Sequence, residues 1–376
     1  MSALVFWFSL ALVAYTYAGY AMLVELLARR RGQAPQTGSA APPLTVVVAA
    51  FNEAGRIRAR VADILAQDYP ASHLNVVVVS DGSNDGTAGA AAVDDSRVQV
   101  LALPENRGKA VALNSAMQMV ATALVVFTDA RQSFAPMALR RLVAAFADPQ
   151  VGAISGELEL REKIDGQTRP APAGLYWRME KQLREGEAQL GWLHGVSGAI
   201  HALRKDLFQP LPAGTVLDDM WIPLQAIFQG QRVWMARDAI VRDDCSIDSG
   251  EEFGRKLRTL AGNWQLIARM PQLLDPWRNP VFTAWISHKL LRLIAPWALI
   301  AAWISSALAE GTMYRVAFML QCAAYTAAAF ALAAPRIAVR IPLLAAAGSF
   351  VMLNSAALLA LPACAAMDTQ RLWKKH

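Results

Sequence analysis

Acidic and polar side chains follow three short apolar runs that predict β-strands. Phe51-Asn52-Glu53 follows Thr45–Ala49, Asp81 opens the segment DGSNDG after Asn75–Ser80, and Asp129-Ala130-Arg131 follows Leu124–Thr128. Each segment alone is typical of a turn or a helix cap. Three of them at corresponding strand ends indicate a site, because ligands bind beyond the carboxyl ends of parallel strands. Carboxylate oxygens in such a place suit Mg²⁺ or Mn²⁺ together with substrate phosphates.

The elements that must position these residues alternate between strand and helix patterns. Short β-branched runs predict four strands, at Thr45–Ala49, Asn75–Ser80, Val98–Leu103 and Leu124–Thr128. Between and after them, helix-patterned segments lie at Ala54–Gln67, Gly86–Val93, Gly108–Ala121 and Ala135–Ala147. Continuously apolar strands that alternate with helices predict an α/β fold with a parallel sheet covered on both faces.

The segment from about 150 to 270 has fewer clear strands, at Gly152–Ser155 and Arg232–Met235. It contains two segments with amphipathic helix patterns, Leu175–Leu190 and Phe253–Ala268. Such helices either cover the sheet or lie on a membrane surface. The apolar stretches that follow the second helix favour the membrane surface.

The two ends of the chain are apolar. Of the 376 residues, 55% are hydrophobic and only 18% are charged, against about 25% in a typical soluble domain. Ser2–Leu27 is nearly all apolar and is followed by Arg29-Arg30-Arg31. Because the charges follow the apolar run, this pattern favours an uncleaved membrane anchor with an outside N-terminus over a cleaved signal peptide.

Three further apolar stretches, at about Trp285–Leu308, Tyr314–Ala334 and Ile341–Leu361, are each long enough to cross a bilayer. Arg336 and Arg340 indicate a cytoplasmic loop between the last two. Four crossings would leave the basic residues of the tail outside, which contradicts the same rule. Either the last stretch is re-entrant or one segment lies in the membrane interface.

Charge and cysteine content exclude several classes. The net charge of +6 is explained largely by cytoplasmic flanks of membrane segments, although an anionic substrate or lipid surface would also fit. The three cysteines have no metal-ligand spacing, which argues against a zinc site or a disulfide framework. No basic stripe interleaved with aromatic residues indicates nucleic acid.

The motifs of the central region resemble those of the membrane-bound family 2 inverting glycosyltransferases, which have a GT-A fold and include cellulose, hyaluronan and chitin-oligosaccharide synthases. The matching segments, in order, are VVVAAFNEAGRI (46–57), VVSDGSNDGT (78–87), ENRGKAVALN (105–114), VVFTDA (125–130), VSGAIHALRKDLF (196–208), VLDDMWIP (216–223) and RKLRTLAGN (255–263). The resemblance implies a mixed, mostly parallel sheet flanked by transmembrane and interfacial helices. The expected organisation is a transmembrane helix at 1–28, a linker at 29–43, a cytosolic catalytic domain at 44–270, an interfacial segment at 271–284, a transmembrane region at 285–363 and a tail at 364–376.

For the donor, the resemblance implies that Asn52 and Glu53 contact the nucleoside and that Asp81 hydrogen-bonds the base, uracil. Lys109 would approach the diphosphate, where a lysine outside such a motif would be read as a solvated helix residue. Asp129 would bind the metal, or the ribose and phosphates, as the first Asp of the family's DxD motif.

For the acceptor, the resemblance implies that Gly198 and Ala199 form the floor under the acceptor sugar. Asp219 would be the general base, and Asp218 would shape its surroundings. The competing interpretation of this acidic pair is that it caps a helix N-terminus.

Two motifs depart from the family pattern. Arg131 stands where DxD has its second acid, so either Asp129 binds the metal with another group or Arg131 itself neutralises charge. In the last motif, Arg255 and Thr259 replace the Gln and Trp of Gln-x-x-Arg-Trp around Arg258. Arg255 and Arg258 lie one turn apart and could still hold a diphosphate. With Thr259 in place of Trp, this motif lacks the aromatic platform for the acceptor sugar.

The expected activity is therefore inverting transfer from a UDP-sugar, with Mg²⁺ or Mn²⁺, at the inner membrane. The acceptor would be a lipid-linked saccharide or a polysaccharide, in exopolysaccharide or glycolipid synthesis. One alternative is a processive synthase that self-associates or works with an export partner. Another is a non-catalytic scaffold subunit that binds nucleotide-sugars. A transporter is poorly supported, because the apolar segments have few charges beyond His288 and Lys289.

Overall fold

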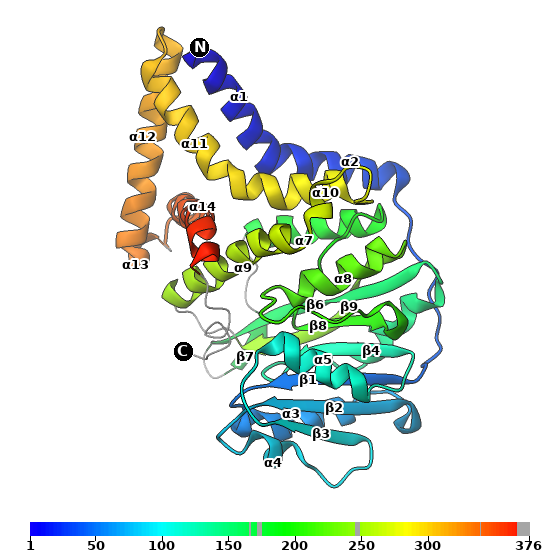
Figure 1. Cartoon of the computed structure of the whole chain (residues 1–376). Coiled ribbons are helices and arrows are strands. Elements are labelled where there is room, and N and C mark those ends of the chain that lie inside the picture. The colour runs from blue at the N-terminus through cyan, green and yellow to red at the C-terminus, as the bar shows by residue number, and fades with distance from the viewer. Residues whose placement is uncertain (165–166, 171–174, 245–248, 339, 367–376) are drawn as a thin grey trace. The chain divides into compact units, whose positions relative to one another are not determined.

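The chain divides into two compact units, drawn in Figure 1, and the computed structural model describes residues 1–164, 167–170, 175–244, 249–338 and 340–366. The sheet unit consists mainly of Val24–Ser246 with Asp275–Ala284. The helical unit consists of Met1–Leu23, Ile247–Leu274 and Trp285–Met367. Each unit is described by itself.

The sheet unit is built on one mixed sheet, in the order β3-β2-β1-β4-β8-β6-β9-β5 among the described residues, with β7 paired to β6. The first four strands along this order are parallel, and β8 is antiparallel to both of its neighbours. The strands are β1 (Leu44–Ala50), β2 (Leu74–Asp81), β3 (Val98–Leu103), β4 (Leu124–Asp129), β5 (Ser133–Phe134), β6 (Val151–Ile164), β7 (Gln167–Pro170), β8 (Ile200–Arg204) and β9 (Arg232–Asp244).

Helices cover the central strands. The helices of the sheet unit are α3 (Ala54–Leu65), α4 (Thr87–Ala91), α5 (Lys109–Met119), α6 (Ala138–Val143), α7 (Leu175–Gln189) and α8 (Asp218–Phe228). Every residue of β1 is buried, as expected for a parallel strand covered on both faces. Alternate residues of β1, such as Val46 and Val48, pack with Ile57 and Val61 of α3 in the main core. α5 also packs against β1 and β2.

The helical unit contains the apolar ends of the chain. Its elements are α1 (Ser2–Ala14), a π-helical turn at Tyr15–Gly19, α9 (Ser249–Arg269), a π-helical turn at Ile286–Leu290, α11 (Leu291–Leu308), α12 (Thr312–Ala333), α13 (Pro335–Ala338) and α14 (Pro342–Ala365). α1 continues into the sheet unit as α2 (Tyr20–Arg31), and α10 (Phe282–Trp285) leads into α11. Among the residues that the structure describes, four continuous helices are long and apolar enough to cross a membrane: Ser2–Arg31, Phe282–Leu308, Thr312–Ala333 and Pro342–Ala365.

The predicted fold class is confirmed: an α/β unit with a mixed sheet, joined to long apolar helices. Each predicted strand and helix overlaps an observed element, but β6 and β9 extend well beyond the predicted strands Gly152–Ser155 and Arg232–Met235. β8, which the sequence pattern did not predict as a strand, lies between β4 and β6 and brings Gly198 and Ala199 to the edge where β4 ends.

Candidate active site

The loops after β1 and β2 are tied together by side chains from both. The backbone N–H of Asn52 donates to Ser83 Oγ at 3.1 Å, and its side-chain Oδ1 accepts from the backbone N–H of Asn84 at 3.0 Å. The backbone N–H of Glu53 donates to Thr87 Oγ1 at 2.8 Å. Asn52 has a φ of 53°, in the left-handed region that Asn tolerates better than most residues. The predicted nucleoside contacts Asn52 and Glu53 are thus held in a fixed loop.

Asp81, at the end of β2, is fully buried. Its Oδ1 accepts from the backbone N–H of Arg107 at 3.0 Å and its Oδ2 from that of Gly108 at 2.8 Å. Gly82 has a φ of +64°, and a Cβ there would lie 2.2 Å from the backbone N of Asn106. The observed role of Asp81 is therefore to fix the loop that precedes Lys109, and its contact with a base stays a prediction.

Lys109 joins two of the predicted acids. Its Nζ lies 3.1 Å from Asp129 Oδ1, at the end of β4, and 3.0 Å from Asp218 Oδ2, in the first turn of α8. Burial by itself lowers the pKa of Lys109, but the attraction of Asp129 and of Asp218 outweighs it, so the pKa lies above its usual value. The ammonium stays charged and links Asp129 to Asp218, two acids that are far apart in the sequence.

Two buried residues near this cluster, His201 and Arg60, were not predicted from the sequence. His201, on β8, is 1% exposed and stacks on Phe127, and its Nδ1 lies 3.0 Å from the carbonyl oxygen of Ser197. Burial lowers the pKa of His201 to about 4; Asp218 opposes this shift and Lys109 adds to it. The imidazole is therefore neutral at pH 7, and electrostatic interaction with Lys109, Asp129 and Asp218 places it near the charged cluster.

Arg60 is the second buried residue that sequence interpretation missed. It is 2% exposed, its Nη2 donates to Thr128 Oγ1 at 2.6 Å, and it forms an ion pair with Asp63. Desolvation lowers its pKa to about 10, against the opposing effect of Asp63. A signal was available, because Arg60 shares the apolar helix face of Ile57, Val61 and Ile64.

The two aspartates at the start of α8, Asp218 and Asp219, differ in burial and in their contacts. Asp218 is 6% exposed and engages Lys109, whereas Asp219 is half-buried. A Cβ added to Gly198 would lie 3.5 Å from Asp219 Oδ2. The backbone of the same loop is held to α8 because Val196 N–H donates to the carbonyl oxygen of Asp219 at 2.9 Å. A methyl group on Gly198 would therefore be in ordinary van der Waals contact with the Asp219 carboxylate, and Ala199 follows Gly198 in the chain.

Arg131, the departure from the DxD pattern, is paired with an acid from β9. Its Nη2 lies 2.9 Å from Asp243 Oδ2, and Gln132 Nε2 donates to the same oxygen at 3.1 Å. Asp243 is 8% exposed, while the Arg131 side chain is 48% exposed. A cation therefore stands two residues after Asp129, and a buried carboxylate holds it.

The other two predicted diphosphate ligands lie in the helical unit. Arg255 and Arg258 are exposed, one turn apart on α9, as predicted. Within the sheet unit, the structure brings together Lys109, Asp129 and Asp218, and separately Gly198 with Asp219. A role of the two arginines at the same site stays a prediction.

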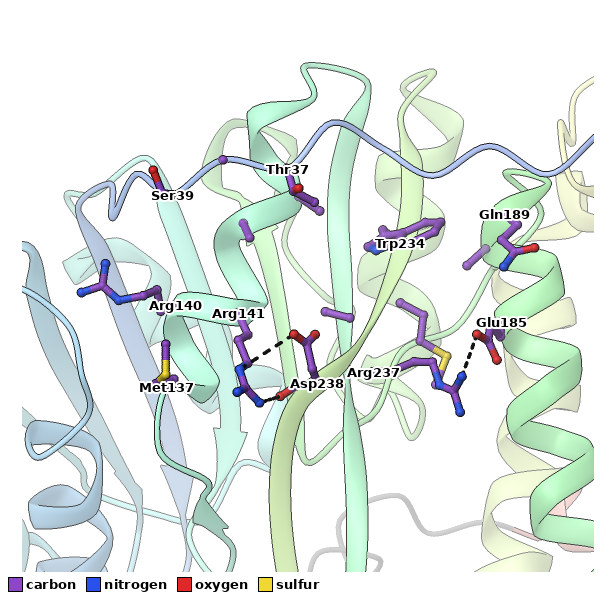
Figure 2. A pocket seen from close by; sticks show the side chains of 16 residues that line it. Thr37, Ser39, Met137, Arg140, Arg141, Glu185, Gln189, Trp234, Arg237 and Asp238 are labelled. Atoms are coloured by element: carbon purple, nitrogen blue, oxygen red, sulfur yellow. Dashed lines mark hydrogen bonds and ion pairs between the residues drawn. The ribbon is translucent and has the colours of Figure 1, made fainter.

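The sheet unit also has a cavity of about 480 Å³, shown in Figure 2. Residues 37–39, α6, α7 and β9 line it, and none of the predicted site residues does. Its charged side chains are paired: Arg237 with Glu185 at 2.9 Å, and Arg141 with Asp238 at 3.8 Å. The cavity is thus separate from the charged cluster around Lys109.

Comparisons with known proteins agree with this arrangement. Residues 45–211 match the family "Glycosyl transferase family 2". The chain is 32% identical to an N-acetylglucosaminyltransferase of Rhizobium meliloti (strain 1021) over 155 residues, which are 40% of this chain and 36% of that protein. It is 33% identical to an N-acetylglucosaminyltransferase of Bradyrhizobium elkanii over 128 residues, which are 33% of this chain and 70% of that protein. The matches cover little more than a third of the length of the first curated relatives.

A solved structure has the same fold. The mannosyltransferase PcManGT from Pyrobaculum calidifontis, determined in complex with GDP-Man and Mn²⁺, aligns with a TM-score of 0.71 and 24% sequence identity, over 99% of this chain and 100% of that one. At this identity, the similarity concerns the fold. The family match over residues 45–211 and the relative from Bradyrhizobium elkanii lead to one assignment: the chain belongs to glycosyl transferase family 2.

Proposed function

We propose that the protein transfers a sugar from a nucleotide-sugar, a UDP-sugar, to an acceptor hydroxyl with inversion at the anomeric carbon. The observation that carries this proposal is that the two aspartates at the start of α8 have different surroundings. Asp218 forms an ion pair with Lys109, whereas the Asp219 carboxylate lies next to Gly198, whose missing side chain lets a substrate group approach. A carboxylate beside a glycine that a substrate can approach closely suits general base catalysis.

In the proposed reaction, the acceptor hydroxyl lies beside Gly198 and gives its proton to the Asp219 carboxylate. The acceptor oxygen then forms a bond with C1 of the donor sugar as the bond from C1 to the diphosphate oxygen breaks. The bonding electrons leave with UDP. A single displacement of this kind inverts C1. Lys109 holds Asp218 and Asp129 in place and supplies a positive charge near the departing phosphates.

The site fits a divalent cation at Asp129. This carboxylate is a hard oxygen donor with a side chain that is 35% exposed, and Lys109 contacts its Oδ1. Mg²⁺ and Mn²⁺ commonly use one or two carboxylates together with substrate phosphates. When bound, the cation would act as a Lewis acid that stabilises the charge of the diphosphate. Arg131 cannot ligate a metal, and we propose that it adds positive charge from its anchored position beside Asp243.

We further propose that the protein is a multi-pass protein of the inner membrane, with a cytoplasmic catalytic domain over about 44–270. Four long apolar helices and the arginines at 29–31 support this. The acceptor is then a lipid-linked saccharide or a growing polysaccharide. Similarity to the "Succinoglycan biosynthesis protein ExoO" of Rhizobium meliloti, 37% identical over 103 residues (27% of this chain and 29% of that protein), supports exopolysaccharide synthesis.

The test is a donor screen with purified full-length protein that follows nucleotide release with Mg²⁺, with Mn²⁺ and with a chelator. UDP-N-acetylglucosamine comes first, because of the names of the relatives, and GDP-mannose is included because of PcManGT. We expect turnover that Asp219→Asn lowers by at least a thousandfold while the nucleotide still binds. Nucleotide binding without turnover of any donor would favour the scaffold alternative.

A processive synthase is the second candidate of the same class. Sizing of radiolabelled products in purified membranes separates it from a single-addition enzyme. We expect products extended by one sugar, because Thr259 replaces the Trp of the processive motif. A long ladder of products would contradict this expectation.

A further inference from the structure

α14 is the most uniformly apolar of the long helices, and its packing differs from that of a crossing helix. It spans 24 residues, about 36 Å at 1.5 Å per residue, which is enough to cross a bilayer. Within the helical unit it packs against α9, α11 and α12. Figure 1 shows α14 nearly end-on beside α9, whereas α12 is seen from the side.

The connections to the sheet unit define one end of the helical bundle, here called the near end. α1 runs towards it, because Tyr20–Arg31 continues into the sheet unit, and the helix Phe282–Leu308 starts from it. The two helices are antiparallel: Tyr15 Oη lies 2.9 Å from Ser287 Oγ near the start of the second helix. At the opposite, far end, Phe6 packs edge-on against Tyr314, at the start of α12. α12 therefore returns towards the near end.

Three points along α14 contact the near ends of its neighbours. Gly348 lies against Ala331, two residues before the end of α12. Tyr17 Oη donates to Asn354 Oδ1 at 2.8 Å, and Tyr17 is two residues from the tyrosine that meets Ser287. Cys364 lies within electrostatic reach of Arg269, the last residue of α9.

These contacts fix the direction of α14. Gly348 and Cys364 are 16 residues apart, or about 24 Å along the helix. In a crossing helix, this length would carry Cys364 through most of a hydrocarbon core of about 30 Å. Instead, both residues meet elements of the near end.

α9 has a polar face that can shield a uniformly apolar helix from water at a membrane surface. α14 is apolar on all sides, with Leu343, Leu359 and Leu361 exposed, so no face of it suits water. α9 is amphipathic: Glu252, Arg255 and Arg258 are exposed, while Ala261 and Leu266 are buried. Packed together, α9 can cover the water-facing side of α14 and leave its other sides to lipid.

We propose that α14 does not cross the membrane but lies in the inner leaflet beneath α9, so that the chain crosses three times and its C-terminal tail is cytoplasmic. This rests on the proposed inner-membrane location. It also places Arg371, Lys374 and Lys375 on the same side as Arg29–Arg31 and Arg336, as the distribution of positive charge requires. The partner of the α9–α14 pair is thus the lipid of the inner leaflet.

Single cysteines in the full chain test this. In a background with the native cysteines replaced by serine, we place one cysteine at Gln370 (tail), Glu310 (far-end loop) or Thr37 (linker), and treat whole cells with a membrane-impermeant maleimide. We expect Glu310→Cys to react in intact cells, and Gln370→Cys and Thr37→Cys to react only after the cells are broken. Reaction of Gln370→Cys but not Thr37→Cys in intact cells would mean that α14 crosses, and would overturn the proposal.

The same experiment separates failure of this inference from failure of the proposed location. Reaction of Thr37→Cys in intact cells, or extraction of the protein by alkaline carbonate, would refute the location itself. If cysteine replacement prevents folding, the wild-type chain with a reporter after His376 gives the answer. Fluorescence of a C-terminal green fluorescent protein supports a cytoplasmic tail, and activity of a C-terminal alkaline phosphatase overturns it.

Discussion

Lys109→Met is the substitution that most directly tests the charged cluster. Methionine keeps the length and most of the volume of the lysine side chain but removes its charge. The change leaves Asp218 and Asp129 without the ammonium that now lies 3.0 Å and 3.1 Å from them. We expect a less stable sheet unit and weaker binding of a nucleoside diphosphate.

The magnitude follows from the exposure of the three side chains. Lys109 is 17% exposed and Asp218 is 9% exposed, so this contact is close to a buried ion pair. Removal of one partner of a buried pair costs about 3–5 kcal/mol, because the other charge stays buried and unpaired. Asp129, at 35%, is screened by solvent and adds little. We therefore expect a loss of about 3 kcal/mol in the free energy of unfolding.

Denaturant unfolding of the full chain in detergent measures this loss in a double-mutant cycle. The variants are Lys109→Met, Asp218→Asn and their combination. Since the combination leaves no unpaired charge at this contact, it should lose less than the sum of the single changes, with a coupling energy of about 0.5–3 kcal/mol. Arg140→Met is the matched control: its pair with Asp68 is 32% and 57% exposed, so its loss should stay below about 1 kcal/mol. Equal losses for Lys109→Met and this control, or additive single changes, would refute the reasoning.

Three further predictions concern the residues around the cluster. Gly82→Ala should destabilise the protein by about 2–4 kcal/mol in the same assay, because the new Cβ would need a left-handed conformation 2.2 Å from the backbone N of Asn106; unchanged stability would contradict this contact. Gly198→Ala should leave the melting temperature unchanged, since the new Cβ would lie at an ordinary 3.5 Å from Asp219 Oδ2. It should lower turnover by about tenfold or more, because the methyl group would displace the acceptor from the position that we propose for it; full turnover would argue against that position. The pKa of His201 is lowered to about 4 in the folded chain, against about 6.5 in the unfolded chain. As the pH drops from about 6.5 towards 4, the unfolded chain binds a proton at His201 that the folded chain does not, so the free energy of unfolding falls over this range. This component amounts to about 2 kcal/mol at pH 5 and should be missing in His201→Gln; an equal acid loss in the variant would contradict it.

Much of the fold was predictable from local pattern. The β-branched runs that became β1, β2 and β4 are buried, apart from the exposed Asn75 and the half-buried Asp129 at the end of β4. A run of this kind has few alternatives to a covered parallel strand. The carboxyl ends of such strands lie at one edge, so Asp81 and Asp129 could be placed together in advance. β8 was missed because its short sequence, IHALR, has no run of β-branched residues.

The pairing of charges was not predictable in the same way. From the sequence alone, Asp129 could form an ion pair with any of three cations, Arg60, Lys109 or Arg131. Their spacing along the chain does not favour one of these pairs over the others. In the structure, Asp129 forms an ion pair with Lys109. Arg60 instead pairs with Asp63 and donates a hydrogen bond to Thr128. Arg131 pairs with an acid from β9, more than a hundred residues away. These ion pairs depend on which strands become neighbours in the sheet, and the separation of two residues along the sequence does not determine that.

This distribution of cations bears on the chemistry. Lys109 forms ion pairs with Asp218 and Asp129, whereas the Asp219 carboxylate lies next to Gly198. If Lys109 had faced solvent, as an isolated helix lysine usually does, Asp218 would stand as an equal candidate for the base. The buried contact of 3.0 Å is thus what distinguishes two adjacent aspartates that the sequence alone presents as a pair. For the same reason, Asp218→Asn should alter stability more than turnover, and Asp219→Asn should do the reverse. A larger loss of turnover in Asp218→Asn than in Asp219→Asn would exchange their roles.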